Sequence, residues 1–340
     1  MPRILVSASF PPELIMRQTP GRTGRWEEFE ITPNDKEDVD GWVVYDNLGM
    51  PQSCRCRPSN TLLITGEPES LRRYRSRFTS QFSQVWTSHR SILHPRVTMR
   101  NEAQPWHYGL RAGRIHGCQL GFDELVKMQR PEKKKLLSVI CSAKAHTDDH
   151  RRRLAFLEPL KAHFGDQLDV FGRGIEEVPD KSDAIYDYKY HIVLENDHSD
   201  YFMTEKLCDA FLGFSYPIYF GGSEAYHRFP EGSFTAIDIY RTEEAINIIE
   251  NVIRSDAYAT NQQQVDEARR RVLYENNICH MIAAHFREHA NMNEAHELVH
   301  LAPKEHRATL IMKQIGRRVL NPFRSDVASK PEESSPGRVA

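Results

Sequence analysis

Short apolar runs alternate with longer helical stretches along most of this chain, and this alternation constrains the fold more than any other feature of the sequence. A strand followed by a helix and a second strand folds into a parallel sheet with helices on its faces. The chain has 340 residues, more than a single hydrophobic core usually organises. We therefore expect an α/β protein of two Rossmann-like domains, with a ligand in the cleft between them, at the carboxyl ends of the strands.

The alternating pattern falls into two successive sets. In the first set we expect strands over residues 4–7, 42–45, 61–65 and 85–87 and a helix over 69–82. In the second set we expect strands over residues 136–141, 168–171, 190–194, 217–220 and 234–239, and helices over 148–164, 204–214 and 242 to about 289.

The domain boundary is expected between Gly113 and Glu132, where glycine, polar and charged residues accumulate. The last residues are rich in Ser, Pro and Glu, a composition typical of segments without fixed structure. The predicted organisation is a first α/β domain over 1–125, a second over 126–290, a C-terminal helical segment over 291–324 and a tail over 325–340.

Charge and cysteine content exclude several classes of protein. Lys and Arg (45) nearly balance Asp and Glu (47), whereas a dedicated nucleic-acid-binding protein needs a strongly basic face. The six cysteines include Cys54 and Cys56 but form neither a disulfide framework nor a CxxC metal site, so we expect reduced thiols. No apolar run approaches the roughly 18 to 20 residues of a membrane-spanning helix. The segment MPRILVSASFPP is typical of a strand rather than a signal peptide, so we expect a cytoplasmic protein.

The most informative stretch runs from Tyr188 to Tyr240. Thr204 is placed to N-cap a helix, which puts Lys206 in the first turn. A cation there opposes the helix dipole unless an anion binds beside it, and free N–H groups at a helix start favour the same anion. A lone lysine of this kind is usually a solvated surface residue, but the apolar strand that runs into Gly221 and Gly222 strengthens the case for a diphosphate site, since glycines allow close backbone approach.

Spaced motifs in this stretch resemble the donor-binding domain of glycosyltransferase family 10, the α-1,3/4-fucosyltransferases, and its bacterial members in particular. Several motifs in register are far more specific than any one of them. The segment LDVFGRG (168–174) and the position of Lys181 also resemble the family. In chain order, the motifs are YKY (188–190), EN (195–196), TEK (204–206), PIYFGG (217–222) and SF (233–234).

The resemblance implies a GT-B fold, with an acceptor-side first domain and a nucleotide-sugar second domain. It implies glycan biosynthesis by transfer of a sugar, L-fucose from GDP-fucose, to a hydroxyl of a glycan acceptor, with inversion in a single displacement. It also implies that neither a cofactor nor a metal ion is needed. The expected partners are therefore a nucleotide-sugar donor and a glycan, and no nucleic acid.

Donor-site residues also follow from the resemblance. Lys206 and an arginine before the first helix of the donor domain would hold the diphosphate; Arg153 is the expected match, with Arg151 and Arg152 as open alternatives. A departing diphosphate gains negative charge, which fixed cations stabilise more in the transition state than in the ground state. The sequence departs from the family pattern at Phe202, where a tyrosine is common. The donor-binding residues implied by the resemblance are Arg153, Asn196, Phe202, Glu205, Lys206, Gly221 and Gly222.

Glu67 is the candidate general base. An acceptor hydroxyl must lose a proton as it attacks, and a carboxylate with a raised pKa is the usual base. Glu67 follows an apolar strand in the segment TGEP, at a carboxyl end that should face the cleft, and TGE resembles the family segment that supplies the base. A glutamate at a strand end is more often a surface residue, but the donor motifs favour catalysis here.

Three alternatives remain open at the level of sequence. The first is a transferase with another nucleotide-sugar donor, because of Phe202, and the second is a catalytically silent nucleotide- or glycan-binding module. The third is a zinc hydrolase, suggested by HELVH (296–300) and the inverted motif HFREH (285–289). We disfavour it because a third ligand is needed and Glu305 and His306 are poor candidates.

Two basic segments have possible binding roles. Arg72, Arg73, Arg75 and Arg77 form either a solvated face or a patch for an anionic acceptor. Residues 309–324 have the pattern of a basic amphipathic helix, which predicts either packing on the protein or peripheral contact with the inner face of a membrane.

Overall fold

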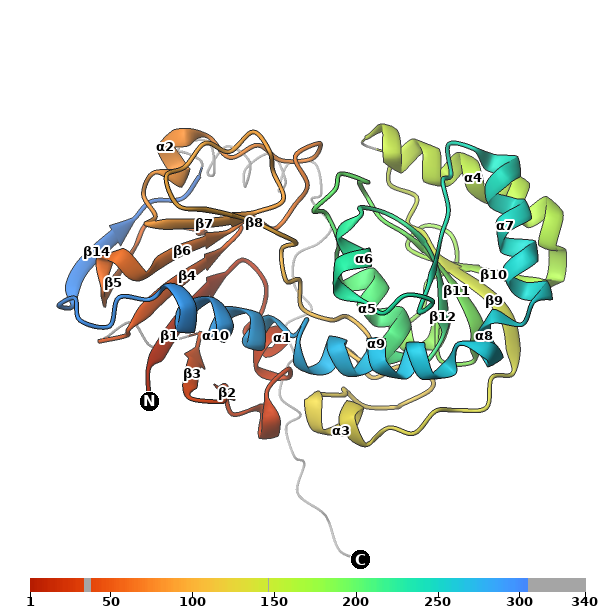
Figure 1. Cartoon of the computed structure of the whole chain (residues 1–340), viewed down its shortest axis with the longest axis horizontal. Helices are drawn as coiled ribbons and strands as arrows, with labels where there is room; N and C mark the ends of the chain where they lie inside the picture. The colour runs from red at the N-terminus through yellow and green to blue at the C-terminus, as the bar shows by residue number, and fades with distance from the viewer. Residues whose placement is uncertain (34–37, 146, 305–340) are drawn as a thin grey trace, which may run out of the picture.

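The computed structural model describes residues 1–33, 38–145 and 147–304. The chain forms a seven-stranded sheet from its first part and a five-stranded sheet from its second part, and these lie side by side (Figure 1). All strand pairs of the two sheets but one are parallel, and each sheet carries its own helices, so the predicted α/β class with two Rossmann-like units is confirmed. The tail over 325–340 and the predicted helix over 309–324 lie outside the described residues.

The first sheet has the strand order β2-β3-β1-β4-β6-β7-β8. All neighbours are parallel except β2 and β3, which are antiparallel. Its central strands are almost completely buried, as expected when helices or loops cover both faces. The strands are β1 (Arg3–Ala8), β2 (Arg25–Trp26), β3 (Phe29–Thr32), β4 (Gly41–Tyr45), β6 (Thr61–Ile64), β7 (Gln84–Thr87) and β8 (Val97–Met99).

The second sheet is entirely parallel, in the order β10-β9-β11-β12-β13. The strand order reverses between β9 and β11, because β10 lies on one side of β9 and all later strands lie on the other. Ligands of open α/β sheets bind at the carboxyl ends of the strands at such a switch point. The strands are β9 (Lys135–Ile140), β10 (Leu168–Phe171), β11 (Tyr188–Leu194), β12 (Tyr216–Phe220) and β13 (Thr235–Ala236).

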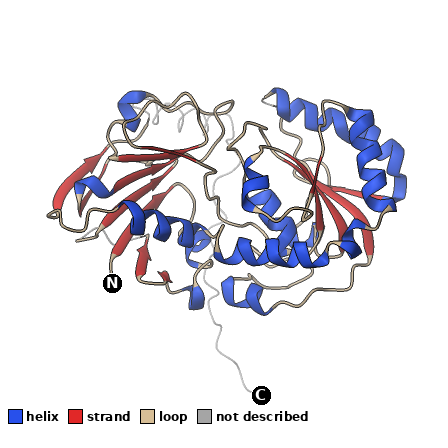
Figure 2. Cartoon of the chain, in the orientation of Figure 1, coloured by secondary structure: helices blue, strands red, loops and turns tan. Residues whose placement is uncertain are grey.

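Helices cover both faces of the second sheet (Figure 2): α4 contacts α7 on one face, and α5 contacts α9 on the other. The predicted helices over 148–164 and 204–214 are confirmed as α4 (Asp148–Phe164) and α5 (Glu205–Leu212). The remaining helices are α1 (Glu13–Met16), α2 (Ser76–Thr79), α3 (Phe122–Lys127), α6 (Glu224–Arg228), α7 (Thr242–Arg254), α8 (Ala257–Thr260), α9 (Gln262–Tyr274) and α10 (Ile278–His289).

The predicted helix over 69–82 is wrong, since only the four residues of α2 are helical. The cause is the anchoring of Arg72 and Tyr74, whose side chains both hydrogen-bond to Asp46. Arg75 then has extended backbone angles (φ −74°, ψ 147°). These tertiary contacts override the helical spacing of the apolar residues in this segment.

The predicted single helix from 242 to about 289 is interrupted. Asp256 has a left-handed backbone (φ 49°), which ends the helical run between α7 and α8. Asn277 caps α10 by accepting a hydrogen bond from the Cys279 amide at 2.8 Å, which starts a new helix there. The strand predicted over 234–239 is likewise shorter, because only Thr235 and Ala236 pair with β12.

The chain returns to the first domain in α10 and in a final strand, β14 (Glu297–Leu301). His285 of α10 bonds to Gln84 of β7 at 2.6 Å, and β14 pairs antiparallel with β5 (Gln52–Cys56). Figure 1 shows α9 and α10 running in succession from the second sheet to the first. The segment predicted as helical over 291–324 therefore contains a strand, because pairing with β5 satisfies its backbone. Residues 305–324 lie outside the described part of the chain.

Because β14 is a strand, it also bears on whether the HELVH motif can bind zinc. A zinc-binding HExxH motif needs a helix, which brings its two histidines to one face about one turn apart. On a strand, residues four apart are separated by about 13 Å. Here His300 hydrogen-bonds Ser53 at 2.7 Å, while His296 lies 3.6 Å from Asp40. The geometry therefore does not support HELVH as a zinc site. The inverted motif HFREH lies on helix α10, where His285 is buried and bonds Gln84.

Within the described residues, no helix is both long and apolar enough to cross a bilayer.

Candidate active site

Two cations meet at the switch point of the second sheet. Cys141 follows β9, and its buried thiol has a raised pKa that the charges of Arg153 and Lys206 both lower in part. The guanidinium of Arg153 donates to the carbonyl oxygen of Leu194, at the end of β11, at 3.2 Å. Burial also lowers the pKa of Arg153. Residues that are distant in sequence thus place two positive groups at the carboxyl ends of β9 and β11.

Lys206 is held by the start of α5, as the sequence predicted. Thr204 is the N-cap, and its side chain accepts a bond from the Lys206 amide at 3.4 Å. The Lys206 ammonium lies 2.9 Å from the Thr204 hydroxyl and 3.0 Å from Oε2 of Glu195. Glu195 is fully buried and also accepts from the Thr204 amide at 2.7 Å. The carboxylate therefore orients both the cap and the cation.

The three neighbouring arginines have different surroundings. Arg153 is buried, and its Nε has no hydrogen-bond partner within the part of the chain that the structure describes. Arg152 stacks over the ring of Tyr240 with its guanidinium carbon 4.7 Å from the ring centroid. Arg151 is exposed, pairs with Asp148 and donates to the carbonyl oxygen of Ala145 at 3.2 Å. Of the three, Arg153 is the one that lies beside Lys206, and Arg152 lies at the wall of the neighbouring cavity described below.

Glu205 belongs to a buried ionic network. Its Oε1 lies 2.9 Å from Nζ of Lys181 and 3.4 Å from Nδ1 of His107, and Lys181 also bonds Asp209 at 2.7 Å. The amides of His107 and Tyr108, in the segment between the domains, donate to Asp209, each at 2.8 Å. These charges hold the pKa of Glu205 well below its usual range. The network ties the interdomain segment to α5.

The same network has the spacing of a metal site. One donor atom from each of His107, Glu205 and Asp209 lies within 4.8 Å of the others. The Lys181 ammonium bonds both carboxylates, however, so a positive charge already occupies the position between them. The residues present therefore match a lysine-filled ionic cluster.

Asn196 and Phe202 differ in their availability to a ligand. Asn196 is half-buried, and its amide makes no hydrogen bond with other described residues. Phe202 is only 1% exposed, so its ring belongs to the core. Tyr201 is half-buried, and its ring lies 5.7 Å from the guanidinium carbon of Arg90 in the first domain. Direct contact between the Phe202 ring and a ligand would require the surrounding loop to move.

The two glycines after β12 allow close packing, though chiefly against the protein itself. A Cβ at Gly222 would lie 2.2 Å from the carbonyl oxygen of Ser199 and 2.6 Å from that of Phe202. A Cβ at Gly221 would lie 2.2 Å from the Tyr219 hydroxyl. These glycines were predicted to allow a close approach to the backbone. In the structure, the group that approaches closely is first of all the protein's own loop after β11.

We expect Gly222→Ala to destabilise the protein by about 1 to 3 kcal/mol, since backbone atoms must move to admit the methyl group. Chemical denaturation would measure the change in the free energy of unfolding. Gly49→Ala is the control, because a Cβ there would meet nothing within 4 Å. Equal stability of the Gly222→Ala variant and the wild type would contradict the packing described here.

Glu67 lies at the carboxyl end of β6, on the side of the first sheet that faces the second domain. Burial raises the pKa of its carboxyl, and the charges of Arg72, Lys206 and Lys144 lower it in part. Lys206 and Lys144 belong to the second domain, so the candidate base and the candidate diphosphate site lie close enough to interact electrostatically. His89 contacts the backbone oxygen of Glu67 at 2.6 Å.

Direct contacts join the two domains beside this site. Ser70 donates a hydrogen bond to Asp197 at 2.5 Å, and Arg90 forms an ion pair with Asp200. Ser70 follows Glu67 in the loop after β6, whereas Asp197 follows the strand that ends beside Lys206. The sequence-predicted residues of the two domains therefore border one region.

A cavity of about 520 Å³ opens next to this region, at the ends of β11 and β12. The ring of Tyr240 is covered by Arg152, and the Tyr240 hydroxyl donates to Asp149 at 2.5 Å. The lining of this cavity combines aromatic rings with one carboxylate, which suits a ligand with a flat polar ring. The lining residues are His198, Phe220, Gly221, Ile237, Asp238 and Tyr240.

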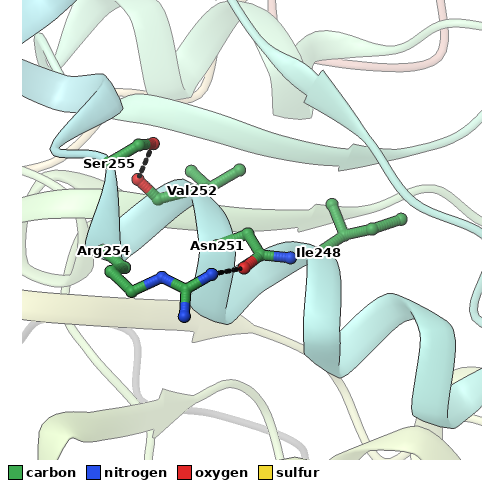
Figure 3. Close-up of a pocket in the computed structure, with 5 residues that line it drawn as sticks. All are labelled: Ile248, Asn251, Val252, Arg254 and Ser255. Carbon is green, nitrogen blue, oxygen red and sulfur yellow. Dashed lines mark hydrogen bonds between the residues drawn. The ribbon is translucent and has the colours of Figure 1, made fainter.

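A second hollow, of about 510 Å³, lies along α7 (Figure 3). Its polar groups bond to one another: Arg254 donates to Asn251, and the Ser255 hydroxyl donates to the Val252 oxygen at 3.1 Å. None of its lining residues belongs to the site described above.

Sequence reasoning missed several residues of this region. Lys144 stands in the exposed loop after β9, and Asp46 follows β4 as Glu67 follows β6. Glu195 was visible as part of the EN motif, and only its contacts reveal that it orients Lys206. A search for charged residues directly after each expected strand would have found Asp46 and Glu195.

Comparison with known proteins agrees with this arrangement. Residues 130–296 match the family described as "Glycosyltransferase family 10 (fucosyltransferase) C-term". No curated protein matches the chain.

Among solved structures, the chain resembles a "Crystal Structure of alpha1,3-Fucosyltransferase", with 18% identity and a TM-score of 0.50 over 84% of this chain and 88% of that one. This likeness confirms the GT-B-like fold. A related structure "with GDP-fucose" has 18% identity and a TM-score of 0.48 over 85% of this chain and 90% of that one. Another, "with GDP", has 17% identity and a TM-score of 0.49 over 84% and 88%.

Proposed function

Because its C-terminal half belongs to glycosyltransferase family 10, the fucosyltransferases, we propose that this glycosyltransferase moves L-fucose from GDP-fucose to a hydroxyl of a glycan acceptor, with inversion at the anomeric carbon. The observation that carries the proposal is the placement of Glu67 within electrostatic range of Lys206 across the domain boundary. A base from one domain and diphosphate-binding cations from the other are the groups that a single displacement requires.

In this mechanism Arg153 and Lys206 bind the diphosphate. The bond between the anomeric carbon and the phosphate oxygen breaks, so negative charge grows on the departing GDP. Both cations are already positioned at the strand ends, which means that little reorganisation is needed as the charge develops. We expect these groups to stabilise the leaving group without a metal ion.

Glu67 takes the proton of the acceptor hydroxyl while that oxygen bonds to the anomeric carbon. Burial raises the pKa of Glu67, which makes its carboxylate a stronger base than an exposed glutamate. The family resemblance, rather than the geometry, supports contacts of Asn196 and Glu205 with hydroxyl groups of the donor, since Glu205 is buried and bonds Lys181. The acid limb of the pH profile should therefore lie above the usual glutamate pKa of about 4.3.

The aromatic cavity beside Arg152 is the proposed nucleoside pocket. Guanine presents adjacent N–H donors, and the carboxylate of Asp238 is the kind of acceptor that such a pair requires. Phe220 and Tyr240 supply flat apolar surface for the base. This lining favours GDP over pyrimidine nucleotides.

Calorimetric titration with GDP, UDP and CMP in EDTA tests the donor site. We expect the wild type to bind GDP selectively, and Lys206→Ala to weaken that binding by about 10-fold to 100-fold, the loss of a charge-assisted contact. Lys189→Ala is the control, since Lys189 lies at the amino end of β11. Preference for UDP would refute GDP-fucose as the donor, and absence of all nucleotide binding would favour a silent module.

A further inference from the structure

Asp46 stands at the end of β4 in an unusual conformation. Its backbone is left-handed, with φ of 64°, although the residue is not glycine. Its side chain is almost completely buried. Strained, buried residues of this kind persist where surrounding contacts over-determine them, and they cluster at functional sites.

Both carboxylate oxygens of Asp46 are used to hold the loop that carries Glu67. Oδ1 accepts a hydrogen bond from the Tyr74 hydroxyl, and Oδ2 accepts one from Arg72. The same Tyr74 oxygen accepts a hydrogen bond from the amide of Gly66 at 3.1 Å. A chain of contacts thus runs from Asp46 through Tyr74 to the residue directly before Glu67.

Gly66 is enclosed from both sides. A Cβ at this position would lie 2.9 Å from the Cβ of Asp46, so the two backbones are in close contact. On the other side, Gln104 donates to the Gly66 carbonyl oxygen at 2.9 Å. The strand end that presents Glu67 therefore has little freedom while Asp46 and Tyr74 are in place.

We propose that Asp46 is the positioning residue of the acceptor side: it fixes Tyr74 and Arg72, and through them it holds Glu67 toward the donor site with a cation beside it. This inference rests on the proposed function of Glu67. Both oxygens of Asp46 accept hydrogen bonds, whereas the Arg72 side chain is 38% exposed and its charge acts on Glu67. Arg72 is accordingly available to contact an acceptor hydroxyl as well.

The charges around Glu67 make this role measurable. Arg72 from its own loop, and Lys144 and Lys206 from the second domain, favour the charged carboxylate, whereas Asp46 disfavours it. His89 contacts only the backbone oxygen of Glu67, and its pKa is lowered by burial, so it stays neutral near pH 7. Removing the charge of Arg72 should raise the pKa of Glu67. Removing the charge of Asp46 has two opposing effects on this pKa, because it also releases Arg72.

The test is a pH titration of protein labelled with [δ-¹³C]glutamate, in which the Glu67 signal is assigned by its loss in Glu67→Gln. We expect Arg72→Gln to move the Glu67 titration up by about half a unit or more. The acid limb of the pH–rate profile for fucose transfer should move up in the same variant. Asp46→Asn should lower kcat, because it releases both Tyr74 and Arg72. Tyr74→Phe should lower kcat about tenfold, the scale of a misplaced catalytic group, at unchanged GDP affinity.

Asp40 provides a matched control, because it precedes β4 as Asp46 follows it, and it also pairs with an arginine, Arg57, at 3.2 Å. Asp40→Asn should leave the Glu67 titration in place. An unmoved Glu67 titration in Arg72→Gln, or an unchanged kcat in Asp46→Asn and Tyr74→Phe, would overturn the proposal. If Asp46→Asn does not fold, Arg72→Gln and Tyr74→Phe still decide it. Failure of the wild type to transfer fucose would count against the proposed function alone, since the titration needs no turnover.

Discussion

Glu67→Gln is expected to lower kcat for fucose transfer by about 10² to 10⁴, the usual contribution of a general base. The amide keeps the size of the side chain but cannot accept the proton of the acceptor hydroxyl. GDP affinity should stay within a factor of about two, because the proposed diphosphate ligands, Arg153 and Lys206, contact the ends of other strands. Steady-state kinetics together with GDP calorimetry would separate the two effects.

Glu69→Gln is the control for this substitution. Glu69 lies two residues further along the same loop and is half-buried, as Glu67 is, but its side chain has no hydrogen bond or ion pair with other described residues. Its substitution should leave kcat nearly unchanged. An equal loss of kcat in both variants, or a parallel loss of GDP affinity in Glu67→Gln, would argue against Glu67 as the base.

Lys181→Ala is expected to destabilise the folded protein by about 3 to 5 kcal/mol. The ammonium lies 2.9 Å from Glu205 and 2.7 Å from Asp209, and both carboxylates are buried. Removal of the cation leaves two buried negative charges without their central partner. Burying an unpaired charge costs more free energy of folding than the intact ion pair contributes. Chemical denaturation at neutral pH would measure the loss in the free energy of unfolding.

The pH dependence of this loss has a defined sign. The pKa of Glu205 is lower in the folded state than in the unfolded state. The ionised carboxylate therefore contributes fully to the free energy of unfolding above the unfolded-state pKa, and this contribution is lost as the pH falls through the folded-state pKa. The stability difference between wild type and Lys181→Ala should therefore narrow in acid. Lys161→Ala is the control, since Lys161 pairs with Glu158 in an exposed ion pair worth at most about 1 kcal/mol. Equal stabilities of the Lys181 and Lys161 variants would contradict the buried network.

Local sequence signals were sufficient wherever one segment determines its own structure. The apolar runs of the central strands predicted most of both sheets, since a buried parallel strand needs an unbroken apolar segment. Thr204 predicted the start of α5 and thereby the position of Lys206, because N-capping depends on neighbouring residues only.

Local signals failed where distant groups compete for a segment. The apolar spacing of residues 69–82 favours a helix, but Asp46 holds Arg72 and Tyr74 in an extended loop. The segment over 297–301 has no strong strand pattern of its own, and it becomes a strand because β5 offers a free edge. In both cases the deciding partner is far away in the sequence.

The sequence by itself predicted the α/β class and the resemblance to glycosyltransferase family 10, because buried strands and closely spaced motifs are properties of single segments. It also identified Glu67 and Lys206 as candidate residues. Only the tertiary structure decided that Arg153 rather than Arg151 lies beside Lys206, that Lys181 fills the space between Glu205 and Asp209, and that Asp46 holds the loop of Glu67. The physical reason is that charge pairing and burial depend on distances in space, which strand order and domain contact set, and which spacing along the chain does not record.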